Sequence, residues 1–200
     1  MTSTGEARGP LLGWLRAALL LFGLGATLGT ALDAVHVHTA TTRYADPLVY
    51  EMAWFVPLLF GAAGVAVGLG RPIFDRLLRR QDPAPGTPAL LGGLALFVVA
   101  YVLSGTLPGG NLLKCATLGA LAVASLALFD RTGLGLLLAC TTAVTGSAVE
   151  AVQIEAGIFS YLAPDRWGVP CWLPCLYACA QVAIGNLGRR LVIVISPRDR

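Results

Sequence analysis

The chain has 200 residues, of which 56% are hydrophobic and only 12% are charged, and its mean hydropathy is +0.73. Soluble domains carry about 25% charged residues, so this composition excludes a soluble globular protein. The formal net charge of +3 is small and does not indicate a nucleic-acid partner.

A helix needs about 20 predominantly apolar residues to cross the hydrocarbon core of a bilayer. Six stretches approach this length, and they predict an all-α, polytopic membrane protein whose single domain, 1–200, is a six-transmembrane-helix bundle. The spans are expected at 11–32, 48–69, 88–107, 112–129, 133–154 and 171–194. Pro108, Gly109 and Gly110 favour a compact turn between the third and fourth spans.

The basic residues predict the orientation of these spans. Of the 14 Lys and Arg residues, all but Arg43, Lys114 and Arg166 fall on the side of the two termini. Cytoplasmic loops carry an excess of Lys and Arg, so both termini are expected in the cytoplasm. Lys114 is the single lysine, a bias typical of GC-rich genomes. We therefore expect a multi-pass protein of a bacterial plasma membrane, or of the endoplasmic reticulum if the source is eukaryotic.

Glycines and prolines within the spans predict how the helices pack. The pairs Gly25/Gly29 and Gly64/Gly68 have the small-xxx-small spacing that lets two helix backbones approach closely. Pro57 and Pro174 are expected to interrupt the second and sixth spans. Kinked helices beside closely packed ones leave a cleft, and an uncharged cleft open to the bilayer suits a lipid.

Ionisable and metal-ligating residues give weaker indications. His36 and His38 are expected in a strand-like loop, as a metal-ligand pair or, more commonly for such a motif, as solvated side chains. Glu51, Glu150 and Lys114 are expected near the outer surface, where their charged groups either have a functional role or extend into solvent or pair with one another. The spans also hold five cysteines, Cys115, Cys140, Cys171, Cys175 and Cys179. The last three form a stripe with helical spacing, for which packing is favoured over metal binding. Neither a metal site nor a cofactor is predicted.

A short motif recurs at the inner surface. Phe74-Asp75-Arg76 follows the second span and Phe129-Asp130-Arg131 follows the fourth. Each motif places a ring at the hydrocarbon edge and an ion pair in the headgroup layer. One interpretation is a mutual ion-pair clamp between two helix ends, and another is a docking surface for a membrane protein.

Several motifs together resemble the Insig (insulin-induced gene) family, and the chain looks like a bacterial homologue. The resemblance runs from about Arg16 to Leu191. It is carried by Ala53-Trp54-Phe55-Val56-Pro57, Gly61, Gly68, Pro72-Ile73-Phe74-Asp75-Arg76, Phe129-Asp130-Arg131, Gly157, Tyr161, Pro164-Asp165, Trp172-Leu173-Pro174-Cys175 and Gly185-Asn186-Leu187-Gly188-Arg189.

This resemblance implies a six-helix fold that binds oxysterols and retains partner membrane proteins. It implies a lipid site that includes Phe97 and Thr117, with Leu113 standing where the family has a glutamine and Leu126 where it has a tryptophan. It further implies a partner-binding surface, which we place at Asp130, Asp75 and Arg76.

Three functions are consistent with the sequence. The first is a non-enzymatic protein that holds a sterol-like or diacylglycerol-like lipid against Phe97, Leu113, Thr117 and Leu126. The second is a membrane adaptor that retains a partner membrane protein through the Asp130 face. A homo-oligomer is a further partner arrangement that the sequence leaves open. The third is a small membrane enzyme or transporter that uses Glu150, Glu51 and Lys114.

Overall fold

The computed structural model describes residues 8–80 and 85–195, and within them it contains six helices that are long and apolar enough to span a membrane. The predicted all-α, six-span membrane fold is therefore confirmed. The helices are α1 (Arg8–Leu24), α2 (Thr30–His38), α3 (Val56–Leu77), α4 (Thr87–Thr106), α5 (Asn111–Phe129), α6 (Gly133–Glu155) and α7 (Leu173–Ile195). α1 and α2 form one span, joined by the π-helical turn η1 (Gly25–Gly29).

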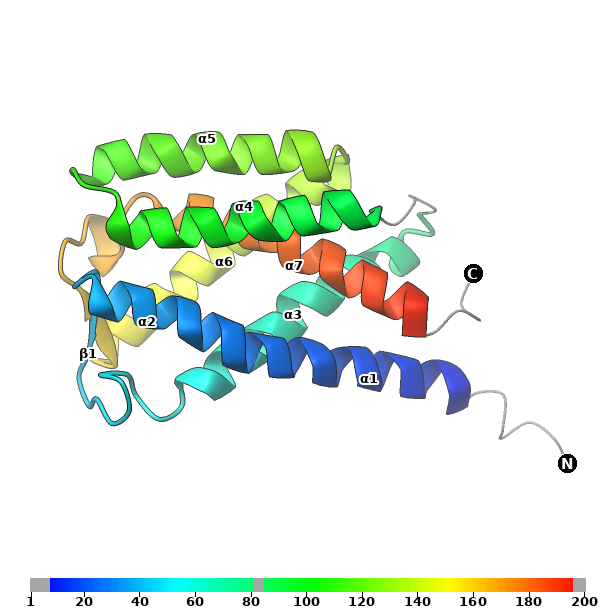
Figure 1. Ribbon diagram of the computed structural model, residues 1–200, viewed down its shortest axis with the longest axis horizontal. Coiled ribbons are helices and arrows are strands. Elements are labelled where there is room, and N and C mark those ends of the chain that lie inside the picture. Colours follow the sequence, from blue (N-terminus) through cyan, green and yellow to red (C-terminus); the bar gives the residue numbers. More distant parts are fainter. Residues whose placement is uncertain (1–7, 81–84, 196–200) are drawn as a thin grey trace, which may run out of the picture.

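α7 is the central helix of the bundle. It packs against α1, α3, α4, α5 and α6, and 12 of its 23 residues are buried. Figure 1 shows α4 and α5 as a hairpin on one side of α7, with α1 and α3 on the other side. The hairpin turn follows the predicted break, because α4 ends at Thr106, α5 begins at Asn111, and Gly109 between them has a φ of +117°.

A two-stranded antiparallel sheet closes the end of the bundle that lies away from the described ends of the chain (Figure 1). β1 (Thr42–Tyr44) follows α2 and β2 (Phe159–Tyr161) follows α6, with Arg43 opposite Ser160. We call this the sheet end. The main hydrophobic core gathers there, around the fully buried Trp172 and the rings of both strands. The sequence did not predict these strands.

The glycine pairs permit close helix contacts, as predicted. A Cβ atom added to Gly25 would overlap the carbonyl oxygen of Phe60 in α3, and one added to Gly64 would lie 2.8 Å from a carbonyl oxygen of α1. The closest approach joins α3 to α7, where a Cβ atom on Gly188 would overlap the carbonyl oxygen of Gly68. Only glycine fits at such a backbone contact.

The predicted interruption of two spans by proline is wrong. Pro57 is the second residue of α3 and Pro174 is the second residue of α7, so each lies in a first helical turn. The missing N–H of proline costs nothing there, because that turn has unpaired N–H groups in any case. The second span consequently begins at Val56, and Glu51 lies in the loop before it. The irregular turn inside a span is η1, and Pro72 is the proline inside a helix.

Candidate functional site

A groove of about 670 Å³ opens at the sheet end between α2, α4 and the loop that precedes α3. Its apolar wall comes from one side of α2, and its polar rim carries hydroxyl, imidazole and carboxylate groups. The lining residues are Ala31, Ala34, Val35, Val37, His38, Thr39, Tyr50, Glu51 and Thr106. This volume lies within the range of about 300–1,000 Å³ that is typical of small-molecule sites. We call it the sheet-end groove.

A second, smaller cavity of about 110 Å³ lies beside the groove. It is formed by the segment after α2, the end of α4, the start of α5 and the loops around β2. The lining residues are Thr39, Ala40, Thr41, Gly105, Asn111, Lys114, Tyr161, Ala163 and Trp172. We call it the annex. Thr39 lines both cavities.

His36 joins α2 to α4 between these cavities. Its Nε2 lies 2.7 Å from the hydroxyl of Ser104, and that hydroxyl donates its own hydrogen to the carbonyl oxygen of Tyr101. Nε2 must therefore carry a hydrogen and donate it. The imidazole also stacks on the ring of Tyr101 at 4.5 Å between centroids. The strand-like loop predicted for this histidine pair is wrong, because both residues lie in α2, with His36 buried and His38 exposed in the groove.

Two carboxylates within the spans accept hydrogen bonds from phenols. Asp33 accepts one from Tyr44 at 2.7 Å, and Glu150 accepts one each from Tyr161 and Tyr177 at 2.6 Å. Burial is the first cause that raises the pKa of Tyr44 and of Tyr161, and the neighbouring carboxylate adds to it. Both phenols therefore remain protonated and act as donors. These carboxylates stabilise the sheet end.

The structure does not bring the three groups of the enzyme or transporter hypothesis into one site. Glu51 lines the groove and Lys114 lines the annex. Glu150 reaches the annex only through the hydroxyl of Tyr161. A shared reaction centre for Glu51, Glu150 and Lys114 is therefore not supported.

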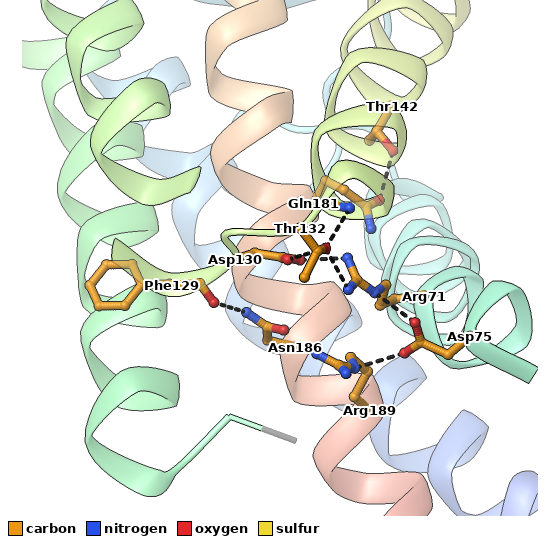
Figure 2. Close-up of polar contacts among 10 residues, drawn as sticks. Arg71, Asp75, Phe129, Asp130, Thr132, Thr142, Gln181, Asn186 and Arg189 are labelled. Carbon is orange, nitrogen blue, oxygen red and sulfur yellow. Dashed lines mark hydrogen bonds and ion pairs between the residues drawn. The ribbon is translucent and has the colours of Figure 1, made fainter. Parts of the chain in front are cut away.

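A buried ion-pair network lies at the opposite end of the bundle (Figure 2). Arg71 of α3 contacts Asp130 at 2.5 Å and Asp75 at 3.2 Å, and it donates to the hydroxyl of Thr132 at 3.0 Å. Arg189 of α7 contacts the other oxygen of Asp75 at 2.8 Å. The side chain of Arg71 is only 1% exposed, and the network ties α3 and α7 to the connection between α5 and α6.

The recurring aspartates are thus joined through Arg71, which belongs to neither motif. Arg71 contacts both Asp75 and Asp130, and Arg189 contacts Asp75 as well. Arg76 is exposed and lies over the ring of Trp14, 4.7 Å from its centroid. Arg131 donates to the carbonyl oxygen of Ala127 instead. Of the predicted partner-binding residues, Asp130 and Asp75 therefore face inward and only Arg76 faces outward.

The four predicted lipid-binding residues lie on the α4–α5 hairpin, and neither cavity includes them. Phe97 is half-buried and meets the ring of Tyr101 edge-on at 6.0 Å. Leu113 is 51% exposed near the start of α5. Thr117 and Leu126 are half-buried along the same helix. Their role in lipid binding stays a prediction.

The cysteines do not form the helical stripe that their spacing indicates. Cys171 is exposed and precedes α7, whereas Cys175 is half-buried and Cys179 is buried within the helix. In the described ranges all five cysteines are free, and no three His, Cys, Asp or Glu side chains are arranged to hold a metal ion.

Comparison with known proteins identifies the family. A family model described as "Insulin-induced protein (INSIG)" matches residues 16–89 and 111–192, which is more than half of the chain. The chain belongs to the Insig family. The predicted resemblance is therefore confirmed. Insig proteins form a family of regulatory, non-enzymatic membrane proteins.

Individual Insig proteins are similar over most of this chain. Insulin-induced gene 1 protein of Danio rerio is 30% identical over 184 residues, which cover 90% of this chain and 73% of the fish protein. Insulin-induced gene 1 protein of Bos taurus is 29% identical over 184 residues, which cover 90% of this chain and 67% of the bovine protein. The solved structure of MvINS, an Insig homologue from Mycobacterium vanbaalenii, aligns with a TM-score of 0.75 and 30% identity over 86% of this chain and 92% of that one. The structure of a cross-linked MvINS trimer aligns with a TM-score of 0.77 and 30% identity, over 88% of this chain and 94% of the MvINS chain.

Sequence reasoning missed two features of this Insig fold. The groove wall is made of small apolar residues such as Ala31 and Ala34, which carry no distinctive signal in a hydrophobic span. Arg71 was expected beyond the second span, 48–69, among the basic residues on the side of the termini, whereas it lies inside α3. Its position four residues before Asp75 was the available signal, since charges at that spacing pair along a helix.

Proposed function

We propose that this Insig-family chain is a non-enzymatic lipid-binding membrane protein. Its ligand is an amphipathic lipid, sterol-like or diacylglycerol-like, held in the sheet-end groove. The supporting observation is the groove itself, whose wall of alanine and valine side chains meets a rim of Thr39, Thr106 and Glu51. Apolar walls with a few polar groups are typical of small-molecule sites.

The arrangement of the helices supports entry of a lipid from the side. α2 packs on α4 at the sheet end, where Ser104 and His36 meet, while α1 runs away from α4 toward the other end (Figure 1). The exposed rim residue Tyr50 and the exposed wall residue Ala31 leave the groove open to the surroundings of the bundle. A lipid can therefore place its rings or acyl chains on α2 without crossing the polar loops.

Mass spectrometry of solvent extracts from the purified protein tests the proposal. We expect a retained lipid in wild type and its loss in Ala31→Trp, which fills the groove from an exposed position on α2. Ala148→Trp, at an exposed position on α6, is the matched control and should retain the lipid. Leu113→Trp examines the α4–α5 face: loss in this variant alone would move the site to the predicted residues. Absence of lipid from wild type would refute the proposal.

Retention of a partner membrane protein remains a prediction, but the residues that could contact a partner differ from those expected. Because Asp130 and Asp75 are engaged with Arg71 and Arg189, substituting either aspartate acts on the packing of α3 and α7. A direct partner contact at this end would use exposed groups such as Arg76 and Phe74. MvINS has been crystallised as a cross-linked trimer, so a further copy of this chain is one partner to be tested.

A further inference from the structure

Lys114 is a cation whose position is not explained by helix stability. It lies in the first turn of α5, which contains no acidic residue. The positive end of the helix dipole disfavours a cation there. Its ammonium donates to the carbonyl oxygen of Ser104 at 2.7 Å. An ammonium has three donors, so this contact within the described chain leaves donor capacity unused.

The other polar side chains of the annex have already used their donors. Asn111 donates to the carbonyl oxygen of Ala163 and to Asp165, and the indole of Trp172 donates to the amide oxygen of Asn111. Tyr161 donates to Glu150. Thr39 donates to a carbonyl oxygen of α2, so Thr41, whose hydroxyl lies 3.0 Å from that of Thr39, is the donor of that pair. Lys114 is therefore the side chain with hydrogen atoms left to offer.

The charge inside the annex is also that of Lys114. The carboxylate of Asp165 lines neither cavity; it accepts hydrogen bonds from the amide of Asn111 at 2.9 Å and from the N–H of Cys171 at 2.8 Å, and the second bond is the first cause that lowers its pKa. Glu51 belongs to the groove rim and is not among the annex residues. A group entering the annex thus meets one cation, with neutral hydroxyls and rings around it.

The annex and the groove adjoin at one residue, so one elongated molecule could contact both linings. Thr39 lines both cavities, and Gly105 of α4 lies against it, because an added Cβ atom would approach the Thr39 hydroxyl to 2.8 Å. His36 lies 3.2 Å from the same position and fixes the spacing of the two helices. Apolar surface on one side of Thr39 and a cation on the other match the two ends of a charged lipid.

We propose that the annex binds the anionic headgroup of the lipid whose apolar part occupies the sheet-end groove, and that Lys114 selects this headgroup. A phosphate diester offers acceptor oxygens to the unused ammonium hydrogens and neutralises the charge, whereas a neutral glyceride leaves the charge uncompensated. The inference rests on the proposed lipid-binding function. It narrows the ligand class from amphipathic lipids in general to anionic ones.

Competition between two lipids with identical acyl chains tests this inference. The detergent-purified protein is incubated with equal amounts of phosphatidylglycerol and diacylglycerol, and native mass spectrometry counts the bound molecules. We expect wild type to prefer phosphatidylglycerol about five- to tenfold, the range of one partly exposed charge-assisted contact. Lys114→Gln should lose that preference while binding diacylglycerol as before, and Lys114→Arg should keep most of it.

Two controls separate the possible failures. Ala31→Trp should bind neither lipid, and a wild type that binds neither would refute the groove function itself. A wild type that binds both lipids equally, or a Lys114→Gln variant with an unchanged ratio, would overturn only the headgroup inference. The thermal midpoint of Lys114→Gln is measured in parallel. A lower midpoint with an unchanged lipid ratio would show that Lys114 merely ties α5 to Ser104.

Discussion

Substituting Asp130 by alanine should destabilise the whole bundle. The carboxylate is 5% exposed and lies 2.5 Å from the guanidinium of Arg71, which is 1% exposed. Asp130 also accepts a hydrogen bond from Thr132, whose hydroxyl caps the first turn of α6 by accepting from the N–H of Gly135. The substitution therefore leaves the buried guanidinium of Arg71 with one of its two carboxylate partners, and it loosens the start of the next helix.

The expected magnitude follows from the burial of both groups. Removing one partner of a buried ion pair costs about 3–5 kcal/mol, because the remaining charge stays buried without compensation. Asp75 still contacts Arg71 at 3.2 Å, so the cost should lie near the lower limit, about 3 kcal/mol. For a chain of this size, each kcal/mol lowers the thermal midpoint by about 2–4 °C, so a fall of about 6–12 °C is expected.

Thermal unfolding in detergent, followed by size-exclusion chromatography, measures this effect. Arg131→Gln is the control, since Arg131 is exposed, and its midpoint should change by less than about 2 °C. The double variant Arg71→Met with Asp130→Leu should be more stable than Asp130→Ala alone, because it leaves no unpaired cation. A midpoint of Asp130→Ala within 2 °C of wild type would contradict the structural role given to this network.

Two further substitutions test the packing of α7. Gly188→Ala should lower the folded yield sharply, because its Cβ atom would overlap the carbonyl oxygen of Gly68. The control Gly23→Ala should be tolerated, since an added Cβ atom meets nothing within 4 Å there. Equal yields of the two variants would show that α3 and α7 do not touch at Gly188. Tyr177→Phe removes one of the two phenol hydroxyls that donate to Glu150, so the free energy of unfolding should fall by about 1–2 kcal/mol in the same thermal assay. An unchanged thermal midpoint would contradict this prediction.

The parts of the fold that depend on local composition could be predicted from the sequence. The third to fifth spans begin and end within about a residue of the expected positions, because apolar length and the Pro108-Gly109-Gly110 turn determine them. The glycine contacts were equally predictable, since small residues four positions apart on an apolar helix are typical of close helix–helix contacts. Pro57 and Pro174 were misjudged because a proline in a first helical turn and one in a kink look alike in an apolar stretch.

The candidate site depended on contacts that span the sequence. His36 and Ser104 are separated by 68 positions, and Arg71 and Asp130 by 59, so no local pattern reveals either contact. The groove wall is harder still, because alanine and valine occur throughout the spans. Resemblance to the Insig family indicated lipid binding and the residues of the α4–α5 hairpin, whereas the groove lies on the neighbouring side, against α2.

The position of a bound lipid tests the central claim most directly. A photoreactive lipid with its reactive group in the acyl chain is activated on the membrane-embedded protein, and the labelled residues are identified by mass spectrometry. The groove model predicts labels on Ala31, Val35 and Thr106 that excess unlabelled lipid suppresses. Labels spread evenly over the exposed faces of α5 and α6, unaffected by competing lipid, would contradict a lipid site at the sheet end.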